Sequence, residues 1–182
     1  MKAITIKQPW AFLIVHGIKD IENRTWACPE KYIGHRVLIH ASGKPVETRN
    51  PNSVFTKAQW DSLPVEFQRK IICAEGIVNS AIIGSVMITD CVVNHPSIWA
   101  EKGVYNWVLS NAVLFSEPIP AKGKLSFWDF DGLKEVTIEC PECGSHEIAI
   151  EDYTTVPYPT YLHSCNKCGY VIMESEWEVV ST

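Results

Sequence analysis

The sequence predicts a mixed, β-rich α+β fold, in which a β-barrel with flanking helices is followed by a small four-cysteine unit. Three observations predict it. Short strand-like apolar segments outnumber helix-like ones in residues 1–131. Two Cys-x2-Cys pairs lie near the C-terminus, and aromatic residues give way to acidic ones after residue 131. We therefore expect two domains among the 182 residues, 1–131 and 132–182.

The composition is typical of a globular protein, with 46% hydrophobic and 20% charged residues. No apolar run approaches the roughly 20 residues that a membrane helix needs. The N-terminal residues MKAITIKQPW contain neither the long apolar core nor the cleavage site of a signal peptide. We expect a cytoplasmic protein with no membrane partner.

The beginning of the chain predicts two strands and one helix. Residues 2–7 (KAITIK) alternate as a strand does. Residues 8–17 (QPWAFLIVHG) place apolar side chains at helical spacing, with Pro9 near the first turn and Gly17 as the stop. Residues 35–43 (HRVLIHASG) are expected to form the second strand.

The middle of the first domain predicts two short helices and a long strand. Residues 56–76 indicate two helices that are separated at Pro64, with Thr56 as the N-cap of the first. Residues 81–93 (AIIGSVMITDCVV) form a long apolar run, in which Gly84 indicates a bulge or a close approach of another segment.

Two further segments complete the first domain. Residues 104–115 (VYNWVLSNAVLF) predict a strand that ends near Asn111. Residues 117–130 (EPIPAKGKLSFWDF) are expected to be extended, with two prolines and a final aromatic strand. Dominant strands with few helices favour a closed or nearly closed barrel.

Four cysteines near the C-terminus have the spacing of a metal site. Each pair is Cys-x2-Cys, 21 residues separate the pairs, and a glycine follows each pair. Four thiolates match the tetrahedral coordination of structural zinc and leave no open position for catalysis. Two redox dithiols are the alternative, and His146 and His163 are possible substitute ligands. Strands are expected at residues 147–153, 160–165 and 170–177. We expect a zinc ribbon whose structural zinc is bound by Cys140, Cys143, Cys165 and Cys168.

The charge divides the chain in a similar way. Residues 1–132 hold 14 Lys and Arg against 12 Asp and Glu, whereas residues 133–182 hold 2 against 9. Because phosphate repels so acidic a segment, a nucleic-acid surface is expected only in the first domain. The acidic ribbon is expected to dock onto that domain or onto a partner protein.

One short stretch concentrates charge directly after the apolar run WAFLIV. Residues 16–26 (HGIKDIENRTW) hold Gly17, Lys19, Glu22 and Arg24 within eight residues. A helix-to-strand turn with solvated charges is one interpretation, and a preformed pocket for a polar ligand is the other. On a strand, a turn or bulge between Lys19 and Glu22 is needed to point both side chains to one side.

This motif, Gly-x-Lys-x-x-Glu-x-Arg, resembles the signature of the ASCH domain, a PUA-like β-barrel family. The later segments IHAS, IIGSVMITDCV, YNWVLSN and EPIPAKGKLSFWDF resemble the same family in the expected order. The resemblance covers about residues 1–131, and the ribbon lies outside it. It implies a cleft beside the first helix, lined by the motif and used for RNA or modified nucleosides.

Some small members of the family resemble amidohydrolases that remove an acetyl group from N4-acetylcytidine. Those members use a lysine, a threonine and a distant glutamate. Lys19 matches the lysine, but Glu22 occupies the position of the threonine. Because a carboxylate is a different nucleophile from a hydroxyl, the sequence favours binding over hydrolysis.

The residue types indicate roles in such a pocket. Arg24 can donate to a phosphate or a carbonyl edge, or it can pair with Glu22. Lys19 can neutralise phosphate, or act as a base if burial lowers its pKa. Glu22 can accept a hydrogen bond from an exocyclic amine such as that of cytosine. Trp10 and Trp26 offer stacking faces for a base.

His40, Ser42 and Lys44, in the segment IHASGK, are expected to line the rim of the same pocket. A packed strand histidine is an equally good interpretation of His40.

Three functions follow as hypotheses. The first is binding of RNA or a modified nucleotide through the charged cleft, in RNA metabolism or its regulation. The second is an amidohydrolase acting on N4-acetylcytidine-like nucleosides, or a ribonuclease, with Lys19 and Glu22 as its catalytic acid/base pair. The third is a protein-interaction adaptor that acts through the acidic ribbon.

Overall fold

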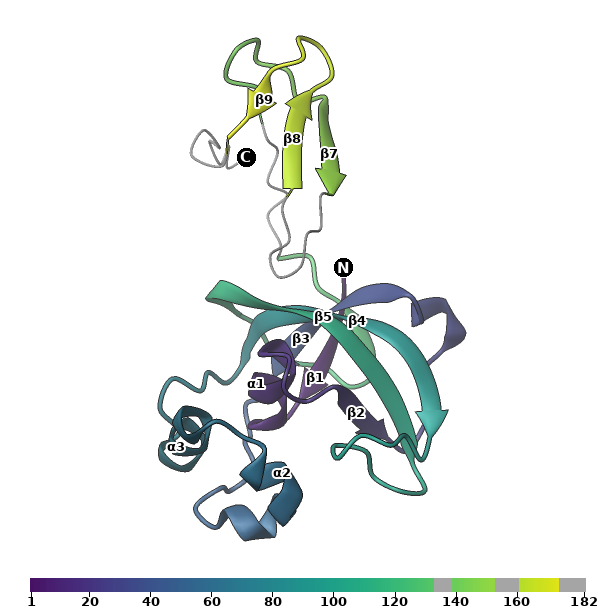
Figure 1. Cartoon of the computed structure of the whole chain (residues 1–182), viewed down its shortest axis with the longest axis vertical. Coiled ribbons are helices and arrows are strands. Elements are labelled where there is room, and N and C mark those ends of the chain that lie inside the picture. The colour runs from purple at the N-terminus through teal and green to yellow at the C-terminus, as the bar shows by residue number, and fades with distance from the viewer. Residues whose placement is uncertain (133–138, 153–160, 174–182) are drawn as a thin grey trace. The chain divides into compact units, whose positions relative to one another are not determined.

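A computed structural model describes residues 1–132, 139–152 and 161–173. The chain divides into two compact units, Met1–Gly132 and Leu133–Thr182. Among the described residues, the first unit contains the helices and a six-stranded sheet, and the second contains a three-stranded sheet (Figure 1). No helix in the three described ranges is both long enough and apolar enough to cross a membrane.

The first unit is built on one curled sheet. Its strands are β1 (Lys2–Ile6), β2 (Ile21–Arg24), β3 (His35–Ala41), β4 (Ala81–Val93), β5 (Tyr105–Pro120) and β6 (Phe127–Asp129). They lie in the order β2-β5-β4-β3-β1-β6. β1 and β3 are parallel, and the other neighbours are antiparallel. The long β4 and β5 bend the sheet into a half-barrel (Figure 1), which confirms the predicted β-rich α+β fold.

The helices are short and follow the predicted order. They are α1 (Trp10–Val15), α2 (Lys57–Asp61) and α3 (Val65–Cys73), with 3-10 turns at Glu30–Tyr32 and Pro51–Ser53. The predicted cap of α2 is confirmed, because Thr56 Oγ1 accepts from Gln59 N at 3.2 Å and Gln59 Oε1 accepts from Thr56 N at 2.9 Å. Pro64 separates α2 from α3, as expected.

The sequence predicted that this strand ends near Asn111, but β5 continues to Pro120. Asn111 has a φ of 48°, a left-handed conformation that asparagine tolerates better than most residues. Opposite it, the β4–β5 register shifts between Ser85 and Met87. The irregularity is therefore a bulge within a longer strand.

α1 is apolar on every side and is correspondingly buried. Ile14 and Val15 belong to the cluster that packs on the sheet, whereas Phe12 and Leu13 belong to a second cluster. The second cluster includes side chains from the α2–α3 region, namely Phe55, Leu63 and Ile71. A helix that is hydrophobic all round requires packing on both sides. The chain that leaves α1 therefore starts from a fixed position.

Gly84 marks the close approach predicted from the sequence. The β4–β5 register shifts between Ile82 and Gly84. A Cβ atom at Gly84 would lie 2.2 Å from Val113 O and 2.8 Å from Val15 Cγ1. The absence of a side chain at this position therefore lets β5 and α1 pack on β4.

We predict that Gly84→Ala lowers the free energy of unfolding by about 3 kcal/mol, because backbone must move to relieve the clash. Urea denaturation measures this loss. Gly34→Ala is the matched control: its Cβ meets nothing within 4 Å, and only its φ of 78° opposes the substitution. We expect the control to cost about 1 kcal/mol. Equal losses for the two variants would contradict the packing argument.

The second unit contains β7 (Ile148–Asp152), β8 (Tyr161–Cys165) and β9 (Val171–Ile172). They form an antiparallel sheet in the order β7-β8-β9. The first two predicted strands are thus present. Residues 174–177 of the third predicted strand lie outside the described residues.

Candidate functional site

A tight turn after α1 places the charged motif. Gly17 has a φ of 70°, and its N–H donates to Ile14 O at 2.9 Å. The next two amides, of Ile18 and Lys19, both donate to Leu13 O, at 3.0 and 3.1 Å. Glycine suits this left-handed position because it has no Cβ. The turn therefore carries Lys19 back beside the end of α1, directly before β2.

The motif forms a buried ion cluster. Lys19 Nζ lies 3.5 Å from Glu22 Oε2, and Arg24 Nε lies 3.0 Å from Glu22 Oε1. Lys19 Nζ also donates to the carbonyl oxygen of Ile21. Lys19 is only 5% exposed and Glu22 only 8%. A turn with solvated charges is therefore the wrong interpretation of these two residues.

Burial changes the acid–base chemistry of Lys19. Removal from water lowers the pKa of the Lys19 ammonium below its ordinary value of 10.5, while attraction and a hydrogen bond from Glu22 oppose the shift. Glu101 and Asp20 oppose it further. Lys19 therefore loses its proton more easily than a solvated lysine does.

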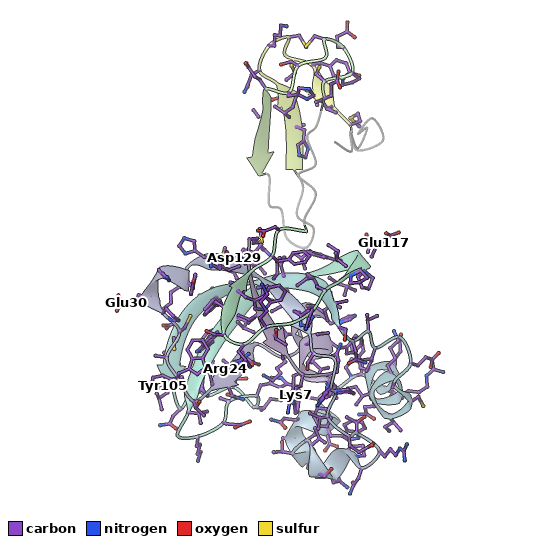
Figure 2. The ribbon with its side chains drawn as sticks, turned by 180° about the vertical axis from the view of Figure 1, so that it is seen from behind. Lys7, Arg24, Glu30, Tyr105, Glu117 and Asp129 are labelled. Carbon is purple, nitrogen blue, oxygen red and sulfur yellow. The ribbon has the colours of Figure 1, made fainter. Side chains whose placement is uncertain are left out.

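Arg24 joins the cluster to β1, a strand that is not a neighbour of β2 in the sheet. Its Nη2 donates to Thr5 O of β1 at 3.1 Å, and Figure 2 labels Arg24. Its Nε, although close to Glu22, is not aligned for a hydrogen bond and has no other partner among the described residues. Its Cζ lies 5.7 Å from the ring centroid of Trp107, within range of a cation–π contact. Arg24 thus fixes the Glu22 carboxylate mainly by charge.

A cavity of about 170 Å³ lies beside this cluster; we call it the motif cavity. It is smaller than the roughly 300–1,000 Å³ of pockets for drug-sized ligands, so it suits a group no larger than a single base. It combines aromatic surface with one lysine and two glutamates. Its lining residues are Trp10, Lys19, Glu22, Asn23, Val54, Gln59, Trp99 and Glu101.

The loop between β4 and β5 supplies one wall of the motif cavity, which the sequence reasoning missed. Asn23 Nδ2 donates to Trp99 O at 2.9 Å, and Asn23 Oδ1 accepts from Glu101 N at 3.1 Å. Asn106 Nδ2 donates to the same Asn23 oxygen at 2.9 Å. This network fixes Trp99 and Glu101 beside the motif. A tryptophan followed by a glutamate in a polar loop was the only local signal.

The structure brings some of the predicted site residues together and separates others. Trp10 lines the motif cavity, and its ring centroid lies 5.8 Å from Lys19 Nζ. Trp26 instead is half-buried and packs edge-on against Trp107 of the core cluster, with ring centroids 4.7 Å apart. Gly17 lines a separate cavity of about 100 Å³ that Lys19 also borders.

The three residues expected at the rim lie elsewhere. His40 and Ser42 line a different cavity, and Lys44 lines neither that cavity nor the motif cavity. The motif cavity therefore contains Trp10, Lys19 and Glu22 from the prediction, with Arg24 in contact with Glu22.

The four cysteines of the second unit converge on one point. Their sulfur atoms all lie within 4.8 Å of one another. The sulfurs of Cys140 and Cys168 are 3.6 Å apart, as are those of Cys143 and Cys165. Sulfurs around a tetrahedral zinc, at about 2.3 Å from the metal, would be about 3.8 Å apart. The cysteines can therefore hold one metal ion, and contacts between the pairs favour one shared site over two dithiols.

The glycine after each pair closes a tight turn. Gly144 and Gly169 have φ values of 67° and 76°, and their N–H groups donate to Cys140 O and Cys165 O, each at 2.8 Å. These left-handed turns suit glycine. They curl the backbone around each pair.

The first unit belongs to a known family. The ASCH domain family matches residues 4–119, so the chain belongs to this family and the resemblance seen in the sequence is confirmed. The chain is also similar to activating signal cointegrator 1 of Mus musculus, with 26% identity over 138 residues. This match covers 70% of the chain and 22% of the mouse protein, so the chain spans about a fifth of that relative's length.

We predict that Lys19→Met lowers the free energy of unfolding by about 3 kcal/mol, because it leaves Glu22 buried without one of its two cationic partners. Combining Lys19→Met with Glu22→Gln should cost less than the sum of the two single losses, since both charges are removed together. Urea denaturation of the wild type, the two single variants and the double variant measures this coupling.

The control for this cycle is the ion pair on α3, in which Lys70 Nζ lies 2.8 Å from Glu66 Oε1. Glu66 is 65% exposed at its side chain, so the coupling there should be much weaker than at Lys19 and Glu22. Strictly additive losses at Lys19 and Glu22 would show that the two do not act as a pair.

Proposed function

We propose that the first unit binds RNA or a modified nucleotide by taking one base into the motif cavity, in RNA metabolism or its regulation. The observation that carries this proposal is the pairing of two buried, opposite charges on the wall of a base-sized cavity. A buried carboxylate and a buried ammonium are costly to maintain, and a polar ligand that uses both offers a reason for them.

The two charges offer complementary hydrogen bonds to the edge of a base. Glu22 can accept from an exocyclic amine, and Lys19 can donate to a ring nitrogen or carbonyl. Cytosine presents both kinds of group side by side, so a cytosine-like base fits this pair best. Trp10 supplies aromatic surface for the face of the ring.

The side-chain amides of Asn23 and Gln59, which line the motif cavity, already form hydrogen bonds within the protein. Both ends of the Asn23 amide are used to fix the β4–β5 loop. Gln59 caps α2 with its oxygen and donates to Ile98 O at 2.8 Å. The charged side chains therefore carry the recognition of the ligand.

The regulatory half of the proposal draws on the mouse relative. That protein is named activating signal cointegrator 1, and this name supports the regulatory part of the proposal.

We predict that Glu22→Gln weakens binding of a short single-stranded oligocytidylate about 10- to 100-fold, the loss of one good contact to a base edge. Fluorescence anisotropy with the labelled oligonucleotide measures this. Binding of oligouridylate, which lacks the exocyclic amine, should change less. The matched control is Glu30→Gln, an exposed residue outside the motif cavity.

Thermal melting should first show that each variant is folded at the assay temperature. Unchanged affinity for oligocytidylate in both Glu22→Gln and Lys19→Met would contradict the proposal.

Hydrolysis of an N4-acetylcytidine-like nucleoside is the second candidate function. The observation in its favour is a second carboxylate, that of Glu101, in the motif cavity. The same cavity holds Lys19, and burial lowers the pKa of the Lys19 ammonium. Water would add to the acetyl carbon, and the C–N bond would break to release acetate and the free amine. Incubation with N4-acetylcytidine, followed by chromatography, tests this. Turnover that Lys19→Met abolishes would establish the enzyme, and parallel incubation with RNA tests for ribonuclease activity.

We propose that zinc is the metal of the second unit and that its role is structural. Four thiolates suit zinc and complete its tetrahedral coordination. So small a unit has little apolar core, and a bound metal can supply the missing stability. The acidic ribbon remains the surface that we propose for a protein partner.

We predict about one zinc ion per chain in protein purified without chelator, measured by elemental mass spectrometry. Cys165→Ser should lower this content severalfold, whereas Cys73→Ser, an exposed cysteine of the first unit, should not. Chelation should collapse the amide NMR signals of residues 139–152 and 161–173 and leave those of the first unit dispersed. Zinc content below roughly one ion per two wild-type chains would contradict the proposal.

A further inference from the structure

A second cavity in the first unit has the opposite charge character from the motif cavity. It measures about 530 Å³, and we call it the basic cavity. Its lining includes two lysines and three hydroxyl groups but no carboxylate. The lining residues are Thr5, His40, Ser42, Gly43, Ser80, Ala121, Lys122, Gly123, Lys124 and Leu125.

Hydrogen bonds hold the segment between β5 and β6 at several points, and this segment carries both lysines. Ala121 N donates to Ser80 O at 3.0 Å. Thr5 Oγ1 donates to Lys124 O at 2.8 Å, and Trp128 Nε1 in turn donates to Thr5 Oγ1 at 3.2 Å. The backbone between the two lysines is therefore held in place, while both lysine side chains remain exposed.

His40 lies under this segment with an unmatched polar atom. It is only 1% exposed, and its Nε2 lies 3.0 Å from Ala121 O. Its Nδ1 is buried and has no hydrogen-bond partner among the described residues. A buried polar atom without a partner is energetically costly, and the protein tolerates this cost in packing the segment on His40.

Gly123 is what allows the segment to lie on the His40 ring. A Cβ atom there would lie 2.4 Å from His40 Cε1 and 2.6 Å from His40 Nδ1. Both distances are shorter than any real contact, so a larger residue would displace the segment and its lysines.

One acidic group close to Lys124 already has a partner. The Asp129 carboxylate interacts with the charge of Lys124 but is paired with Lys2 Nζ at 2.8 Å; Figure 2 labels Asp129. Among the described residues, neither Lys122 nor Lys124 forms an ion pair, although Lys124 Nζ lies 5.6 Å from the ring centroid of Trp128. A phosphate group matches this combination of lysines and hydroxyls.

We propose that the basic cavity binds a phosphate group. The motif cavity has more negative than positive side chains in its lining and cannot serve a phosphate well. One residue links the two sites: Thr5 lines the basic cavity, and its carbonyl accepts from Arg24, which contacts Glu22. The phosphate belongs either to the backbone of a bound RNA or to a free phosphate ligand. Only this choice of source rests on the proposed function.

The first arm of the test uses RNA and the full chain. Lys122→Gln with Lys124→Gln is compared with a control pair of exposed lysines outside the cavity, Lys31→Gln with Lys57→Gln. Affinity for labelled oligocytidylate is measured by anisotropy over a range of salt concentrations. We expect the cavity variant to bind about tenfold more weakly and its log–log salt slope to fall by about 1.4, since each contact to a single strand contributes about 0.7. The control pair should leave the slope unchanged.

The second arm uses inorganic phosphate alone. Phosphate is titrated into the ¹⁵N-labelled full chain, against chloride at equal ionic strength, while the amide signals of Gly43 and Gly123 are followed. We expect saturable shifts that the cavity variant loses and the control pair keeps. Gly123→Ala should lose them as well, because it displaces the lysines.

The two arms separate the possible outcomes. A reduced salt slope assigns the phosphate to RNA, whereas phosphate shifts without any effect on RNA assign it to a free ligand. If the wild-type chain binds no RNA, the proposed function fails and the phosphate arm alone decides this inference. No phosphate shifts, together with an unchanged RNA affinity and salt slope in the cavity variant, would overturn it.

Discussion

The buried contact between Lys19, Glu22 and Arg24 is the constraint on which the rest of the first unit depends. Two of these side chains are almost fully removed from water, so each needs an opposite charge held at close range. α1, buried on both sides, fixes the start of the turn, and Gly17 lets that turn reverse within two residues. β2 then presents the carboxylate to both cations. An apolar helix and a sheet are thus used to position a polar cluster.

In our proposals, the two cavities of this unit divide the chemistry of a nucleotide between them. The motif cavity offers paired charges, aromatic surface and room for one small group, which suits the edge and face of a base. The basic cavity offers lysines and hydroxyls in a larger space, which suits a phosphate. Specific contacts to bases and sequence-independent contacts to phosphates are separate tasks in nucleic-acid recognition. Separate sites allow each electrostatic environment to be adjusted independently.

Much of the fold could be predicted because its signals are local. The Thr56 cap, the break at Pro64 and the apolar run of β4 each depend on residues close in sequence, and each prediction is confirmed. β5 was predicted too short, because the sequence does not show whether Asn111 ends a strand or forms a bulge within it. Pairing with β4 makes that choice.

The sequence by itself determined the charged motif, the four-cysteine pattern and the membership of the ASCH family, since each is written in short spacings. Only the tertiary structure decided which side chains share a cavity. Trp99 and Glu101 reach the motif across more than 70 residues through Asn23, whereas His40 and Ser42 line another cavity and Trp26 packs against the core. Strand pairing and loop hydrogen bonds set these neighbours, and such long-range contacts leave no periodic trace in the sequence.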